Sequence, residues 1–67
     1  MKGLAYYYAE FQRELAAVDL RLVEEFKDVS STQSPRDVFR WLEERRTHGQ
    51  LPASLENVLT DFYWELS

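Results

Sequence analysis

The chain has no cysteine and a single histidine, and these two scarcities exclude several kinds of site. Without cysteine, neither a disulfide nor a thiolate-bound zinc ion can form. His48 follows Glu44 by four residues, a spacing that places both on one helix face, but zinc needs three or four ligands. We interpret this pair as polar neighbours on a solvated helix surface. The sequence therefore predicts no bound metal and no other cofactor.

Glycine is also scarce, and the recognisable catalytic patterns are missing with it. Two glycines in the whole chain rule out a glycine-rich loop that cradles phosphate. Paired carboxylates can act as acid and base only in a cleft that separates their pKa values. The glutamates that come in close pairs, by contrast, fall on the predicted solvated side of a helix: Glu10, Glu14, Glu24 and Glu25. We expect that the protein is not an enzyme.

Long hydrophobic runs are absent as well. No stretch approaches the roughly twenty apolar residues that a transmembrane helix requires. The first residues also lack the basic-then-apolar order of a signal peptide, because Glu10, Arg13 and Glu14 interrupt them. These observations predict a cytoplasmic protein without membrane contact.

Positive charge is in deficit, and the deficit is unevenly distributed. The net charge is −4, divided as −2 over residues 1–29, +1 over residues 30–49 and −3 over residues 50–67. Proteins that bind nucleic acid gain most of their affinity by neutralising phosphates, so an acidic chain is a poor candidate for that role. The charge balance makes nucleic acid an unlikely partner.

The chain does contain apolar residues at helical spacing, and the longest such series lies near its N-terminus. The series recurs in steps of three and four: Leu4, Tyr8, Phe11, Leu15, Val18 and Leu22, continued by Phe26 and Val29. At about 100° per residue these side chains share one narrow stripe. The pattern predicts one long helix over about residues 3–28, followed by a polar linker over residues 29–34.

Two shorter helices are predicted after this linker. Ser34 is a good N-cap, Pro35 suits the first helical position, and Gly49 suits the left-handed residue that closes a helix. These signals place the second helix at about residues 35–48. The stripe of the third helix, at about residues 53–66, contains Leu55, Val58, Leu59, Phe62 and Leu66.

Together these elements predict an all-α fold, a small three-helix bundle with one long N-terminal helix and two shorter helices. The 67 residues are predicted to form a single domain. The residues expected in its core are Phe11, Leu15, Val18, Leu42, Leu59 and Phe62. The long helix would project beyond the two short ones, and its exposed apolar seam would need a second copy. We therefore expect a homodimer.

Five residues are candidates for contact with a partner: Tyr6, Arg13, Leu20, Trp41 and Trp64. Trp64 points away from the apolar stripe of its helix, and Trp41 flanks the core face of residues 35–48. On the long helix, Tyr6 falls opposite the seam, in line with Arg13 and Leu20. Exposed aromatic residues beside arginine are typical of contact hot spots. The same rings could instead cover the edge of the core.

These features favour a non-enzymatic protein–protein interaction module, such as a small regulator, adaptor or inhibitor whose partner is a protein of unknown identity. The alternative is a dimeric DNA-binding regulator that uses Arg36 and Arg40 on the second helix. A helix-turn-helix would place residues 53–66 against the phosphates, and this segment carries three acidic residues and no basic one.

Overall fold

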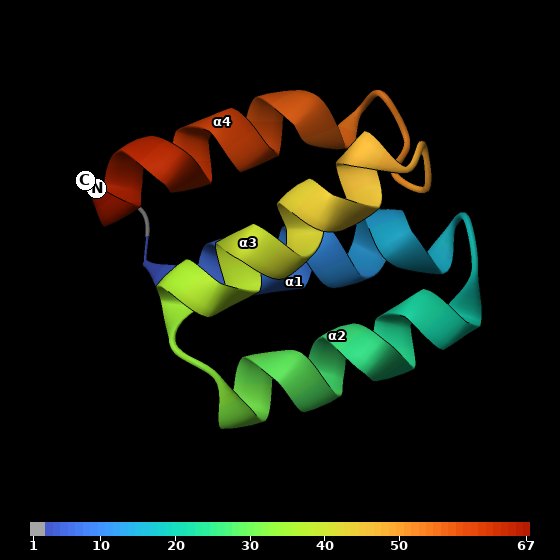
Figure 1. Ribbon diagram of the computed structural model, residues 1–67, viewed down its shortest axis with the longest axis horizontal. Coiled ribbons are helices and arrows are strands. Elements are labelled where there is room, and N and C mark those ends of the chain that lie inside the picture. The colour runs from blue at the N-terminus through green and yellow to red at the C-terminus, as the bar shows by residue number, and fades with distance from the viewer. Residues whose placement is uncertain (1–2) are drawn as a thin grey trace.

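The computed structural model describes residues 3–67, and these residues form four helices without strands. Their bounds are α1 (Leu4–Ala16), α2 (Leu20–Thr32), α3 (Pro35–Thr47) and α4 (Leu55–Leu66). Each helix runs antiparallel to the one before it, in an up-down-up-down order (Figure 1). α1 packs against α2 and α4, and α3 also packs against α2 and α4. The predicted all-α class is confirmed.

The prediction of a single long helix over residues 3–28 is wrong, because the chain turns back within that range. α1 ends at Ala16, and Asp19 has an extended backbone, with φ −160° and ψ 122°. The carboxylate of Asp19 accepts a hydrogen bond from the backbone N–H of Arg21 at 2.9 Å and so caps α2. The described residues therefore form a four-helix arrangement rather than the expected bundle of three.

Burial explains why the chain turns back here. A continuous rod of 26 residues would carry half of its apolar stripe past the short helices and into water. Folded as a hairpin, it brings Leu15 of α1 and Phe26 of α2 into the same core. Because burial of apolar surface is the main favourable term in folding, two short helices are more stable than one projecting rod.

The linker predicted over residues 29–34 is also shorter than expected. α2 continues to Thr32, which leaves only residues 33–34 between α2 and α3. The hydroxyls of Ser31 and Thr32 both donate to the backbone carbonyl of Asp28, at 3.0 and 2.9 Å. These side chains bond back to the preceding turn within the helix, so their usual competition with the helical backbone does not end α2 early.

The boundaries of α3 agree with the sequence. The Ser34 hydroxyl accepts a hydrogen bond from the backbone N–H of Asp37 at 3.3 Å, and Pro35 occupies the first helical position. Gly49 follows the helix with φ 71°, a left-handed conformation that favours glycine. α4 begins at Leu55, two residues later than predicted, because the backbone N–H of Leu55 bonds to the carbonyl of Pro52 in a turn.

A cluster of phenylalanine rings from three helices forms the centre of the core. The ring of Phe11 in α1 lies 5.9 Å from Phe26 in α2 and 5.3 Å from Phe62 in α4, centroid to centroid. The buried apolar residues are Tyr7, Phe11, Leu15, Leu22, Val23, Phe26, Val38, Leu42, Leu55, Leu59 and Phe62. Five of the six expected core residues are thus confirmed. The prediction that Val18 is buried is wrong, since this residue lies in the turn after α1 and is 51% exposed.

The four helices are 12 or 13 residues long, so none projects beyond its neighbours. The lengths of the helices therefore no longer support the homodimer that a projecting seam suggested. A dimer remains a prediction, and it requires a different surface.

Asp19→Ala should lower the free energy of unfolding by about 0.5–2 kcal/mol, because it removes the cap of α2. Chemical denaturation followed by circular dichroism measures this change. Glu24→Ala, which removes one acidic charge from the exposed middle of the same helix, should have a much smaller effect. Equal losses in the two variants would show that the cap does not determine the turn.

Candidate functional site

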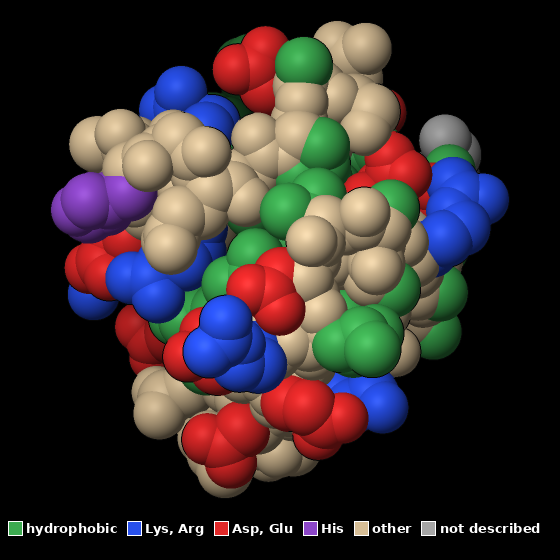
Figure 2. Space-filling view, turned by 90° about the vertical axis from the view of Figure 1, so that its right-hand side faces the viewer, with side chains coloured by type: hydrophobic (Ala, Val, Ile, Leu, Met, Phe, Trp, Pro, Cys, Tyr) green, Lys and Arg blue, Asp and Glu red, His purple; other side chains and the backbone are tan. Residues whose placement is uncertain are grey.

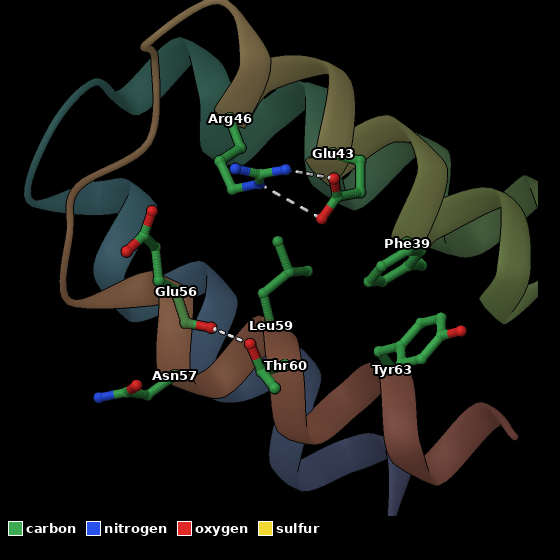
Figure 3. A pocket seen from close by; sticks show the side chains of 8 residues that line it. All are labelled: Phe39, Glu43, Arg46, Glu56, Asn57, Leu59, Thr60 and Tyr63. Atoms are coloured by element: carbon green, nitrogen blue, oxygen red, sulfur yellow. Dashed lines mark hydrogen bonds and ion pairs between the residues drawn. The ribbon is translucent and has the colours of Figure 1, made fainter.

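The surface between α3 and α4 is hollowed into a groove. Two adjoining hollows of about 360 and 340 Å³ share Phe39, Glu43 and Tyr63 as lining residues, so we describe them as one groove. Figure 3 shows the first hollow, with Phe39 and Tyr63 side by side and the Glu43 and Arg46 side chains directed toward each other. The groove is open along the length of two helices and so suits an extended partner surface.

The middle of the groove is aromatic because Phe39 and Tyr63 face each other across the two helices. Their ring centroids lie 5.4 Å apart, and Phe39 also lies 6.4 Å from the buried ring of Phe62. This contact joins the floor of the groove to the core. The floor is therefore held in place by residues that also determine the fold.

One end of the groove, which we call the glutamate end, contains Glu56, Asn57 and the ion pair of Glu43 with Arg46. Arg46 donates to the two carboxylate oxygens of Glu43 at 2.8 and 3.3 Å. This hydrogen bonding, together with the charge of Glu43, raises the pKa of Arg46, and Glu56 contributes a smaller attraction in the same direction. The three charges sum to −1.

The opposite end, which we call the arginine end, contains Arg36 and Arg40 beside Leu66 and Ser67. Arg36 donates to the backbone carbonyl of Leu66 at 3.3 Å, which brings the start of α3 to the end of α4. Arg40 pairs loosely with Asp37 at 3.7 Å. Asp37 lines a separate hollow between α2 and α3. Glu43 also lines the hollow at the arginine end, so the charges of that hollow sum to +1.

Trp64 stands beside the groove, on the outer surface of α4. It is 68% exposed, and its ring packs edge-on against Tyr63 with a centroid distance of 5.6 Å. Tyr63 is itself 49% exposed. Phe39, Tyr63 and Trp64 thus form a continuous aromatic row that leads from the floor of the groove to the crest of α4.

The other candidates on the N-terminal half do not lie in one stripe. Tyr6 and Arg13 belong to α1, and Leu20 begins α2 after the chain has reversed. Tyr6 is 43% exposed and packs edge-on against Tyr7 at 5.2 Å, while Arg13 forms an ion pair with Glu10. The single contact surface that sequence periodicity predicted for these three residues is therefore divided between two helices.

Trp41 belongs to the edge of the core. It is half-buried, its ring centroid lies 6.1 Å from that of Phe26, and the guanidinium of Arg45 lies 5.4 Å above it. Burial by neighbouring side chains limits its availability to a partner. The groove residues that the sequence did not indicate as site residues include Phe39, Glu43, Glu56 and Tyr63. Tyr63 precedes Trp64, and this pair of adjacent aromatics was the available signal.

A second exposed apolar area lies at the end of the bundle that carries the α1–α2 turn. Figure 2 shows hydrophobic side chains across the middle of this end, with acidic and basic side chains around them. Val18, in the turn, and Leu20, which follows it, are exposed by 51% and 70%. None of the described hollows includes either residue.

Residues 3–67 contain no group of three acidic or histidine side chains placed to hold a metal ion. The Nδ1 atom of His48 lies 2.7 Å from the backbone carbonyl oxygen of Glu44, so the imidazole bonds to its own helix end. Within the same range, none of the helices has both the length and the apolar character needed to cross a membrane.

Comparisons with protein-family models, curated protein sequences and solved structures found no match.

Proposed function

We propose that this protein is a non-enzymatic protein–protein interaction module and that the α3–α4 groove with the adjoining Trp64 is its binding surface. The observation that carries this proposal is the aromatic row of Phe39, Tyr63 and Trp64, which extends from the core into solvent. Tryptophan and tyrosine dominate binding hot spots because they bury a large area with few rotatable bonds. A regulator, adaptor or inhibitor would use such a surface.

The charges around the groove suit recognition better than catalysis. Glu43 and Arg46 neutralise each other, and the arginines at the other end lie along α3 rather than converging on one point. A polar rim around an apolar centre is the usual composition of a protein–protein interface. Catalysis would instead require an acid, base or nucleophile directed at one reacting atom.

DNA binding through Arg36 and Arg40 is the alternative, and it has less support. Arg36 bonds to the Leu66 carbonyl, and Arg40 has Asp37 as an acidic neighbour. Glu43 lies on the same face one turn further along the helix. Because phosphate binding depends on concentrated positive charge, these acidic neighbours disfavour a nucleic-acid partner.

Trp64→Ala should reduce capture of partner protein from an extract of the source cells roughly tenfold, with unchanged helix content. Truncation of a hot-spot residue costs about 1–3 kcal/mol, and each 1.4 kcal/mol corresponds to a factor of ten. The immobilised full chain serves as bait, and quantitative mass spectrometry measures the captured protein.

Leu20→Ala is the matched control, because Leu20 is as exposed as Trp64 and does not line the groove. Capture that falls with Trp64→Ala and persists with Leu20→Ala would support the proposed surface. Capture that is unaffected by Trp64→Ala and by Tyr63→Ala would overturn it.

A further inference from the structure

We infer that the occupant of the groove is a second copy of this chain, docked antiparallel around a two-fold axis that crosses the groove near Tyr63. This inference rests on the proposed function, since it names the partner of the same surface. Three observations support it: the opposite charges of the two ends, the aromatic centre and the size of the accessible surface.

The two ends of the groove are complementary in charge. Glu43 lines the hollows at both ends. With it, the arginine end sums to +1 from Arg36 and Arg40, and the glutamate end sums to −1 from Glu56 and Arg46. A two-fold axis reverses the direction of the second groove, so each arginine end meets a glutamate end. The surface is therefore self-complementary, as a symmetric dimer interface must be.

The aromatic centre falls where the axis would cross. Phe39 and Tyr63 line both hollows and so occupy the middle of the groove. In the antiparallel arrangement the two Tyr63 side chains would lie near each other, and each Trp64 would cover part of the opposite copy. Burial of these rings would supply the apolar core of the interface, with the charged ends as its rim.

The accessible surface of the chain is large enough for a standard-size interface. A standard-size interface removes about 800 Å² from each partner. The accessible surface of the chain is 4477 Å², so such an interface would take somewhat less than a fifth of it.

Charge reversal at opposite ends of the groove tests the arrangement by sedimentation equilibrium. The unmodified chain should approach twice its 8.0 kDa mass at high micromolar concentration. Arg36→Glu/Arg40→Glu and, separately, Glu56→Arg should each weaken the dimer at least roughly tenfold. In a dimer of either variant, like charges would meet at both of the symmetry-related contacts between an arginine end and a glutamate end. An equimolar mixture of the two variants should restore the dimer, because both contacts then join opposite charges.

Matched controls reverse charges elsewhere on the surface. Arg21→Glu/Lys27→Glu, on α2, changes the net charge as much as the double variant does, and Asp61→Arg matches Glu56→Arg on the same helix. These controls should dimerise as the unmodified chain does, and circular dichroism verifies that all variants remain helical.

A chain that stays at 8.0 kDa at the highest concentration would overturn the inference. A dimer that tolerates both reversals, or a mixture that fails to restore it, would do the same. If the chain is monomeric but Trp64→Ala still abolishes capture of another protein, self-association fails and the proposed function stands.

Discussion

Phe62→Ala should abolish the cooperative thermal transition of this protein. Phe62 is fully buried, and its ring lies within 5.3–6.4 Å of the rings of Tyr7, Tyr8, Phe11 and Phe39, centroid to centroid. Truncation of a buried phenylalanine costs about 3–5 kcal/mol. A domain of this size has a stability of about the same magnitude. The variant should therefore be largely unfolded at room temperature, as circular dichroism against temperature would show.

Trp64→Ala provides the control for this variant. It removes a larger aromatic side chain two residues further along α4, and that side chain is mostly exposed. We expect its melting curve to resemble that of the unmodified chain. If both variants melt alike, either Phe62 does not lie at the centre of the core or Trp64 is buried.

Leu15→Ala should destabilise the chain by about 2–5 kcal/mol, whereas Val18→Ala should change its stability by less than about 0.5 kcal/mol. Leu15 is fully buried in α1, and Val18 is exposed in the turn that follows. Urea denaturation of both variants measures the difference. This pair of substitutions discriminates the four-helix fold from a continuous N-terminal helix, in which both residues would share one buried seam.

A large loss of stability in Val18→Ala would contradict the turn at residues 17–19. Similar small losses in both variants would place Leu15 outside the core. The expected combination, a severe effect at residue 15 and a minor one at residue 18, arises only if the chain leaves its helical path between them.

Local signals in the sequence predict α3 well because they act within a few residues. Ser34, Pro35 and Gly49 each have a conformation that depends on their own backbone and nearest neighbours. The core positions Phe11, Leu42 and Phe62 could be predicted equally well, since periodicity alone identifies the buried face of each short helix.

The turn between α1 and α2 could not be predicted in the same way. The apolar residues on both sides of it keep the spacing of one helix, so periodicity does not reveal the reversal. Asp19 is a good cap, but an aspartate within a helical pattern also occurs on solvated surfaces. Whether the cap is used depends on how much apolar surface the hairpin buries, which is a property of the whole fold.

Only part of the candidate site could be predicted from the sequence, for a related reason. Trp64 was identified because it lies opposite the apolar stripe of its own helix, and the structure leaves it exposed. The groove depends on which residues of α3 face α4. Phe39 and Tyr63 approach each other from positions 24 residues apart, and no local pattern couples them.

The order of the helices also affects how quickly this chain folds. Each helix packs against the one that precedes it in the chain, so most of the core is assembled by closing loops of a few residues. Among the helices of residues 3–67, only the contact of α4 with α1 joins the N-terminal and C-terminal parts of the chain. Chains dominated by such local contacts cross their folding barrier in microseconds to milliseconds. We therefore expect this chain to refold on the same timescale after dilution from denaturant, which stopped-flow fluorescence of Trp41 and Trp64 would measure.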